Sequence, residues 1–493
     1  MALKLFNTMG KKLQEFVPLQ EGFCGFYGCG PTVYNYAHIG NLRAYVFLDT
    51  LDRTLTFLGY KKKHVMNITD IGHLTGDADD GEDKMLKTAK ERKQSVLDIA
   101  KFYTDAFFND IDRLNILRPD VVCKATDHVP EMIELIKKIE ANGHTYMAGV
   151  NLYYDVSTYK DYGKLANLNL DDLQAGAGKR KVVVVDQNKR NPQDFVLWFT
   201  KSKFEDQALV WDSPWGKGYP GWHIECSAMS MKYLGKHFDI HTGGVDHIPV
   251  HHTNEIAQSE GSFSDEDRAA GPWVNYWLHN AFLVIEGATK MSKSSGNFLT
   301  LQSLVDKGYD PLDYRYFLLG AHYRSPANFS WNSMDSAKNS RKALVQRAAK
   351  VVEAAGGKAA ASLGDKASET LKKFTAAIEN DLGTPAALGV LQTALKDGEV
   401  PAGETLALMQ KMDAVLGLKL EETAKESLKK PATEINSHEG DPEAAEIDAL
   451  VAERTAAKKA KNFARADQIR DELAARGIVI VDTPNGVVWK RNL

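Results

Sequence analysis

Cysteine is scarce in this sequence: only four of its 493 residues are cysteines, and they stand far apart. So few dispersed thiols exclude the dense disulfide framework of a small secreted domain. Long apolar runs are missing too, which excludes a transmembrane helix and leaves the first residues without the apolar core of a signal peptide. We therefore expect a cytoplasmic protein that contacts no membrane and keeps its cysteines as reduced thiols or metal ligands.

A strong excess of charge of either sign is also absent, since the formal net charge is −4. This balance gives no sign of a nucleic-acid-binding protein. The distribution is uneven, however, because residues 454–493 hold nine Lys or Arg and only four Asp or Glu. This local excess predicts a contact with a polyanion near the C-terminal end, although a solvated charged helix explains it equally well.

Strand-like and helix-like segments alternate in the first third of the chain. Two apolar strands over 23–28 and 64–69 flank a turn and a helix over 38–59. This is a βαβ unit, from which doubly wound nucleotide-binding sheets are built. The pattern returns with a helix over 222–234 and a strand over 237–241. The predicted fold class is therefore α/β, with a doubly wound Rossmann-type catalytic domain.

Other parts of the chain differ in pattern. Residues 119–220 hold short β-type runs, over 152–156 and 181–186, among turn residues, as expected of an insertion that divides the Rossmann-type domain into halves at 1–118 and 221–265. Residues 331–430 are Ala/Lys/Leu-rich and predict a helical domain. After a polar linker, residues 440–493 predict a small unit of two helices and a hairpin with a Pro-Asn-Gly turn.

The first motif with chemical meaning is His38-Ile39-Gly40-Asn41, between a strand and a helix. A helix N-terminus offers oriented N–H groups to a phosphate, His38 can add a hydrogen bond, and Gly40 lets an adenine approach the backbone. Taken alone, an ordinary helix start is the commoner meaning of this pattern.

The second motif is a run of two lysines and two hydroxyl residues, Lys290-Met291-Ser292-Lys293-Ser294. Two lysines three residues apart on a loop can neutralise the β- and γ-phosphates of ATP as pyrophosphate departs. A solvated basic turn explains the run equally well when it stands alone. Together with the first motif, phosphate chemistry becomes the better interpretation.

A metal site is the third hypothesis. Four residues have side chains that zinc accepts: Cys29, Cys226, His251 and Glu255. His251 and Glu255 are four residues apart and share one face of a helix. The two cysteines meet only if both lie at the carboxyl edge of one sheet. Unligated buried cysteines are at least as consistent with the residues alone, and His252 and Glu225 are rival ligands.

A fourth motif follows a predicted strand: two glycines precede Asp246, and Gly244 is the second of them. Glycines allow a ribose to approach the backbone, and the carboxylate can accept from its hydroxyls. A tight turn is the commoner explanation in isolation.

Several blocks in this order resemble cysteinyl-tRNA synthetases, a family of class I aminoacyl-tRNA synthetases. The blocks are GCGPTVYNYAHIGN, NITDI, SPWGKGYPGWHIECSAMS, FDIHTGGVDHIPVHHTNEIAQSE, YWLHNAFL and KMSKSSGNF. The segment NFARADQIRDELAARGIVIVDTPNGVVW resembles the family's C-terminal anticodon-binding unit. The resemblance runs nearly from end to end and is most specific in GWHIECSAM together with KMSKS.

The resemblance implies roles for particular residues. The zinc ligands would be Cys29, Cys226, His251 and Glu255. Cys29, Thr69 and Trp222 would contact the cysteine substrate. The catalytic residues would be His38, Asn41, Lys290 and Lys293. The ATP-binding residues would be His38, Gly40, Asn41, Gly244, Asp246, Lys290, Met291, Ser292 and Lys293.

The resemblance also implies a function. The chain would activate L-cysteine with ATP and Mg²⁺ as cysteinyl-adenylate and esterify it to the 3′ end of tRNA(Cys), with one zinc per chain and as a monomer. Residues 266–330 would contact the tRNA stem and carry the KMSKS loop, 331–430 would support the tRNA, and 440–493 would read the anticodon.

Three departures from the family pattern stand out. Asn41 replaces a second histidine of the first signature. Gly72 and His73 lie in one altered stretch, and His247 and Thr253 lie in another. Two alternatives remain: a related ligase that passes cysteine to an amino sugar, and a tRNA-binding relative that has lost catalysis. The C-terminal unit argues against the first, and the intact motifs argue against the second.

Overall fold

The computed structural model describes residues 2–71, 88, 92, 94–167, 186–200, 209–286, 298–429, 443–460, 462–483 and 486–491. These residues form two compact units, over 1–420 and 421–493. Within the described residues, no helix is both long and apolar enough to cross a membrane.

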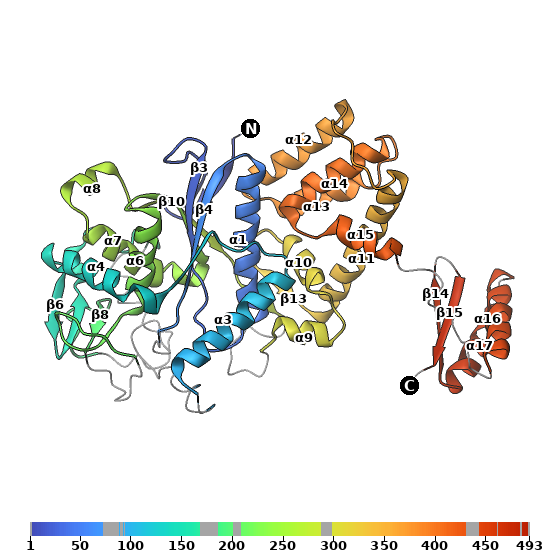
Figure 1. Cartoon of the computed structure of the whole chain (residues 1–493), viewed down its shortest axis with the longest axis horizontal. Helices are drawn as coiled ribbons and strands as arrows, with labels where there is room; N and C mark the ends of the chain where they lie inside the picture. The colour runs from blue at the N-terminus through green and yellow to red at the C-terminus, as the bar shows by residue number, and fades with distance from the viewer. Residues whose placement is uncertain are drawn as a thin grey trace. The chain divides into compact units, whose positions relative to one another are not determined.

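A parallel five-stranded sheet is the centre of the first unit (Figure 1). Its strands, in spatial order, are β11 (Val274–Asn280), β10 (Phe238–Gly244), β3 (Phe23–Gly28), β4 (Lys61–Ile68) and β5 (Val121–Lys124). The chain runs outward from β3 in one direction and from β10 in the other, so the order reverses between these two strands. Ligands of doubly wound sheets bind at the carboxyl ends of the strands beside such a reversal.

Helices cover both faces of the sheet, which confirms the predicted doubly wound class. Helix α1 (Ile39–Phe57) packs on one face with α3 (Val96–Arg113), through an edge-to-face contact of Tyr45 with Phe107. The other face carries α4 (Val129–Ala141), α6 (Trp222–Leu234) and α7 (His251–Gly261) (Figure 1). Helix α1 is buried along most of its length, as its broad apolar set predicts.

The predicted insertion contains an antiparallel sheet in the order β6 (Thr145–Ala148), β7 (Asn151–Tyr154), β8 (Phe195–Phe199), β9 (Tyr219–Pro220). Two further strand pairs are β1 (Lys4–Asn7) with β2 (Lys12–Glu15), and β12 (Leu283–Ile285) with β13 (Ala327–Phe329). The strand-like run predicted over 181–186 lies almost wholly outside the described residues.

The predicted helical domain is also present. Three short helices precede it: α8 (Asp265–Ala270), α9 (Leu301–Asp306) and α10 (Pro311–Leu319). It is formed by α11 (Trp331–Ala354), α12 (Asp365–Glu379), α13 (Thr384–Ala394) and α14 (Ala402–Leu416), and α15 (Leu420–Lys429) follows. The sixfold division of the chain made from the sequence stays a prediction.

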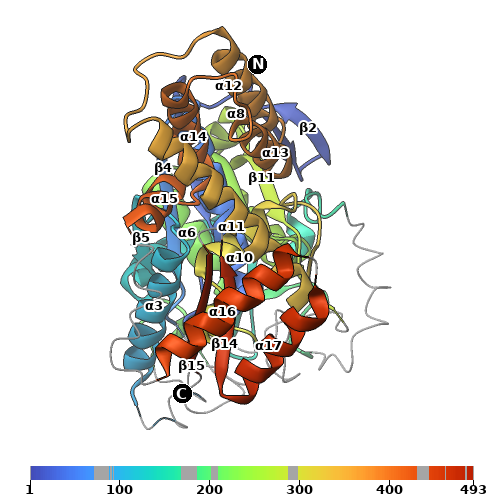
Figure 2. The ribbon, with the colours of Figure 1, turned by 90° about the vertical axis from the view of Figure 1, so that its right-hand side faces the viewer.

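The second unit has the predicted two helices and hairpin. Helices α16 (Ala444–Lys459) and α17 (Phe463–Ala475) pack on one face of β14 (Ile478–Thr483) and β15 (Gly486–Arg491) (Figures 1 and 2). Gly477 follows α17 with a φ of +72°, a conformation that favours glycine, as its place after the helix predicts. A small core around Ile469 and Trp489 holds the unit together.

Candidate active site and metal centre

A cavity of about 370 Å³ opens at the carboxyl edge of the parallel sheet, beside the point where the strand order reverses. Each of four strands delivers lining residues just beyond its end: Cys29 after β3, Thr69 after β4, Asp246 after β10 and Phe282 after β11. One group of lining residues carries thiols and imidazoles, and another belongs to the N-terminus of α1. We call these the thiol end and the phosphate end.

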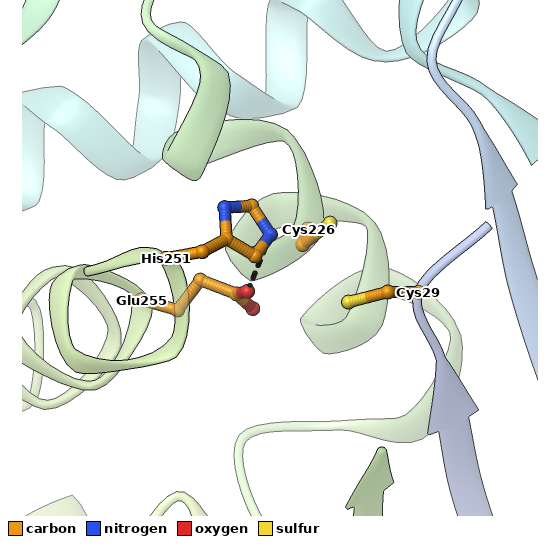
Figure 3. Close-up of side chains that lie close together, drawn as sticks. All are labelled: Cys29, Cys226, His251 and Glu255. Carbon is orange, nitrogen blue, oxygen red and sulfur yellow. Dashed lines mark ion pairs between the residues drawn. The ribbon is translucent and has the colours of Figure 1, made fainter. Parts of the chain in front are cut away.

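The thiol end brings together the four residues proposed as zinc ligands (Figure 3). Each offers one ligand atom, and these atoms all lie within 4.8 Å of one another. Their elements differ: Cys29 follows β3, Cys226 lies on α6, and α7 presents His251 and Glu255 one turn apart. Cys226 therefore reaches the site from the predicted helix, which packs on the sheet, and not from a strand of the sheet.

A close backbone approach fixes the position of Cys29. A Cβ on the next residue, Gly30, would lie 1.7 Å from the carbonyl oxygen of Asn67, so only glycine fits there. The Asn67 side-chain oxygen accepts a hydrogen bond from the Gly30 N–H at 2.7 Å. The segment that carries Cys29 is therefore held against the end of β4.

Electrostatics at the thiol end favour a bound cation. Burial and the adjacent Cys226 raise the pKa of Cys29, whereas the hydrogen bond with Cys29 lowers the pKa of Cys226. Burial would raise the pKa of Glu255, but His241 and His251 outweigh it and lower this pKa to about 2. A metal ion can displace the protons of two adjacent thiols, and an ionised carboxylate attracts it without losing a proton.

The donor set fits zinc. Zinc accepts thiolate, imidazole and carboxylate ligands at about 2.0–2.3 Å in a tetrahedron. Four ligand atoms within 4.8 Å of one another need only a small contraction to reach that geometry. A second group, Cys29, His241, His252 and Glu255, meets the same distance limit. It shares two members with the first but has a single thiol, so the first is the softer and better zinc site.

The two rival ligands lie nearby. His252 Nε2 is 3.4 Å from Cys29 Sγ, and burial together with the neighbouring histidines lowers its pKa far below the usual value. Glu225 is fully buried and belongs to neither group of four. One of its oxygens accepts a hydrogen bond from the Thr69 hydroxyl at 2.8 Å, so it supports a residue of the cavity wall instead.

Outer partners orient the imidazoles. His251 Nε2 lies 2.8 Å from Glu255, and its Nδ1 lies 2.8 Å from Nδ1 of the buried His223. A metal on Nε2 leaves the His251 proton on Nδ1, where it can donate to His223. His252 in turn forms a hydrogen bond with His279, in which Nδ1 of His252 lies 2.8 Å from Nε2 of His279.

Sequence reasoning missed His223, His241 and His279 as parts of this network. A usable signal existed for two of them, because His241 and His279 each lie near the carboxyl end of a strand-like apolar segment. The argument that places Cys29 at the carboxyl edge of the sheet therefore applies to these two histidines as well. Trp222 was identified from the resemblance, and its ring lies 4.3 Å from that of His251 on the cavity wall.

At the phosphate end, His38 is the N-cap of α1. Its Nδ1 accepts a hydrogen bond from the Asn41 N–H at 3.0 Å, and the Asn41 side-chain oxygen accepts from the His38 N–H at 3.2 Å. An accepting Nδ1 carries no proton, so the proton of the neutral ring is on Nε2. Nε2–H is therefore the donor that His38 has for a ligand oxygen. Gly40 and Asn41 also line the cavity.

The segment after the lysine loop contacts the start of α1 through a hydrogen bond and a ring contact. The Ile39 N–H donates to the Leu299 carbonyl at 2.8 Å, and the rings of His38 and Phe298 meet edge to face at 5.9 Å. The loop residues Lys290, Met291, Ser292, Lys293 and Ser294 lie outside the described residues, as do Gly72 and His73.

The fourth motif differs from its prediction. Gly243 and Gly244 belong to β10 itself and do not follow it. A Cβ on Gly243 would lie 2.6 Å from the His252 ring, so this glycine makes room for histidines. Asp246 and His247 line the cavity, and the Thr253 hydroxyl donates to the Ile248 carbonyl at 2.7 Å.

Comparison with known proteins gives the class first. The family model described as "tRNA synthetases class I (C) catalytic domain" matches residues 15–339. A leucyl-tRNA synthetase structure from Agrobacterium radiobacter, in a ternary complex with tRNA and LeuAMS, superposes with a TM-score of 0.59 at 11% identity, over 84% of this chain and 86% of that one. A Mycobacterium tuberculosis methionyl-tRNA synthetase bound by methionyl-adenylate gives 0.55 at 16%, over 82% and 93%. These two likenesses show the fold alone.

Sequence relatives narrow the class to a family. A cysteine–tRNA ligase of Treponema denticola is 57% identical over the whole of both chains. Another, of Novosphingobium aromaticivorans, is 46% identical over 99% of this chain and 97% of its own. The model "Cysteinyl-tRNA ligase anticodon binding domain" matches residues 442–489. The chain belongs to the cysteine–tRNA ligase family of class I aminoacyl-tRNA synthetases.

Proposed function

We propose that this chain activates L-cysteine with ATP, as enzyme-bound cysteinyl-adenylate, and esterifies the cysteine to the 3′ end of tRNA(Cys). One observation carries the proposal: the two thiols and the imidazole of the Cys₂HisGlu group line the same cavity as the N-terminus of α1. A cysteine that bridges this cavity places its thiol at the metal ligands and its carboxylate toward the phosphates. We further propose that the protein acts as a monomer in the cytoplasm.

The thiol end selects the substrate. Cys29, Cys226, His251 and Glu255 would hold a zinc ion, which when bound accepts a substrate thiolate far better than a serine hydroxyl. Trp222 forms part of the cavity wall there. Thr69 also lines the cavity, held by hydrogen bonds with Asn67 at 3.0 Å and with Glu225 at 2.8 Å. This side chain is therefore pre-oriented before substrate binds.

The phosphate end favours the reaction itself. The substrate carboxylate attacks the α-phosphorus of ATP, and pyrophosphate leaves with Mg²⁺. His38 Nε2–H donates to a phosphate oxygen on which charge builds up, and the N–H groups of the first turn of α1 add a positive field. Lys290 and Lys293 neutralise the leaving pyrophosphate, with Met291 and Ser292 in the same loop, while Asp246 and Gly244 contact the ribose.

The adenylate then reacts with the tRNA. The 2′-hydroxyl of the terminal adenosine attacks the acyl carbon, and AMP leaves. An activated acyl group needs positioning more than a dedicated base. The amino-sugar alternative is not favoured, since the relatives match over the full length of the chain and the anticodon-binding model matches its last unit.

Exchange of pyrophosphate into ATP tests the first step. Cysteine should support exchange in the absence of tRNA, serine should support little, and the purified protein should hold one zinc per chain. Exchange that is equal with both amino acids would contradict the proposed selection at the thiol end. Fully active protein without zinc would contradict it as well.

Removal of the part of the second unit that follows α15 tests the last step. A chain that ends at Pro431 should keep cysteine-dependent exchange, because all the described cavity residues lie before it. It should charge tRNA poorly, since it lacks the segment that matches the anticodon-binding model. Equal loss of both activities would show instead that this unit supports the catalytic fold.

A further inference from the structure

A cluster of aromatic side chains lies at the mouth of the cavity. The Tyr36 ring meets Phe102 edge to face at 6.0 Å and Tyr103 at 5.2 Å. The Arg92 guanidinium lies 5.3 Å from the Phe102 ring centre and 5.1 Å from that of Tyr103. We call these four residues the aromatic rim.

The rim continues the cavity wall outward. Tyr36 and Tyr103 line the cavity, and Tyr36 stands two residues before His38. Tyr103 belongs to the buried face of α3, but Phe102 lies off that face and is 44% exposed, and Tyr36 is 39% exposed. Single exposed aromatics are ordinary on protein surfaces. Adjacent exposed rings with an arginine over one of them, at the entrance of an active-site cavity, indicate a surface that binds something.

We propose that the aromatic rim stacks the unpaired nucleotides that precede the terminal adenosine of the tRNA. This inference rests on the proposed function. The terminal adenosine must enter the cavity to reach the adenylate, so the nucleotides before it must cross the mouth. Every unpaired base has two π faces, and aromatic rings with arginine are the side chains that bind such faces in single strands. The Arg92 charge also complements the phosphates between these bases.

A binding experiment with two RNAs tests the rim. The first RNA is the complete tRNA, and the second is the same tRNA without its last three nucleotides. Phe102→Ala should weaken binding of the complete tRNA by about five- to tenfold, within the range of one lost stacked base. It should leave binding of the shortened tRNA within about twofold, because the stacked bases are already missing. Phe102→Tyr, which keeps an aromatic ring, should restore wild-type affinity.

Leu97→Ala provides the matched control, since Leu97 is also on α3 and 51% exposed but belongs to no ring cluster. It should bind both RNAs like the unmodified chain. Equal weakening of both RNAs by Phe102→Ala, or of neither, would overturn the proposal. A tenfold rise in the KM for ATP in tRNA-free exchange would also overturn it, by assigning the rim to the adenine of ATP. Absence of cysteine-dependent exchange in the unmodified protein would contradict the proposed function instead, whatever Phe102 does.

Discussion

The two ends of the cavity are built by opposite means. The thiol end is assembled from side chains that are far apart in the sequence, and its Cys226, His251 and Glu255 are buried. The phosphate end is built largely from one contiguous segment at the start of α1, where Asn41 is exposed to solvent. Charge is neutralised by neighbouring side chains at one end, whereas oriented backbone groups and water are available at the other.

Burial explains this difference. A buried carboxylate or imidazole must find partners in the protein, because unpaired polar groups are costly away from water. Glu255 has them in His241 and His251, each 2.8 Å away. Such a buried site of closely paired groups suits discrimination between a thiol and a hydroxyl. An open helix N-terminus suits the varied positions of phosphates during a reaction.

The largest expected effect comes from removal of one thiol ligand. Cys226→Ser should remove most of the zinc and lower cysteine-dependent exchange by at least about 100-fold, roughly 3 kcal/mol. The KM for ATP should change by less than about threefold, since the phosphate end is untouched. Metal analysis and exchange kinetics measure both. Cys24→Ala is the control, because Cys24 is buried but lies in neither candidate metal group. Cysteine preference that survives without zinc would refute the division between the two ends.

Next in size is the loss of the His38 imidazole. His38→Ala should slow exchange by about 2–4 kcal/mol of transition-state stabilisation, as for other preorganised donors. Asn41→His should stay within about tenfold, or roughly 1.4 kcal/mol, because the backbone N–H of residue 41 can still bond to His38 Nδ1. Steady-state exchange with varied ATP measures both variants. Near-normal exchange in His38→Ala, together with an inactive Asn41→His, would show that the phosphate site is assigned wrongly.

The same contrast explains which parts of the fold and of the site could be predicted from the sequence. Local signals identified β3 and α6 with the observed bounds and placed the start of α1 within one residue, because turns, caps and apolar periods are properties of neighbouring residues. The residues alone left the cysteine pairing open, since Cys29 and Cys226 meet only through the packing of α6 on the sheet. The resemblance supplied that grouping, and the structure brings the four side chains together, although their role as ligands stays a prediction.

Some buried partners were beyond the reach of sequence patterns. Nothing local distinguishes His223 from a histidine in an ordinary core, because its role depends on its contact with His251. The same is true of Arg43, which follows the first motif by two residues. It is buried and donates to four carbonyl groups, those of Phe282, His322, Tyr323 and Ser325.

Arg43 gives a third prediction. Burial lowers the pKa of Arg43 to about 10. Its hydrogen bonds to these carbonyl groups hold the segment that places Phe282 in the cavity wall. Arg43→Met should remove the four hydrogen bonds to these carbonyl groups, three of which keep a backbone N–H donor, and reduce the free energy of unfolding by about 2–3 kcal/mol. In protein that remains folded, the KM for ATP should rise more than the KM for cysteine, because α1 begins at the phosphate end. Denaturant unfolding and exchange kinetics measure the two effects, and an equal rise in both KM values would contradict the link to that end.

The smallest effect concerns a buried carboxyl group that lacks the partners of Glu255. Asp110 on α3 lies 3.6 Å from Arg113, and burial outweighs this pair and raises its pKa to about 6. The unfolded value is about 3.9, so between about pH 4 and pH 6 the folded chain binds more protons at Asp110 than the unfolded chain does. Stability therefore falls as the pH rises through this window.

Asp110→Asn removes the charge and should stabilise the chain by about 1–2 kcal/mol at pH 8 and hardly at all at pH 4. Urea unfolding across this range measures the difference, with the exposed Asp105→Asn, which loses only its ion pair with Lys101, as the control. An Asp110→Asn effect of the same size at pH 4 and pH 8 would show that the neighbours of Asp110, rather than its charge, set the stability at this position.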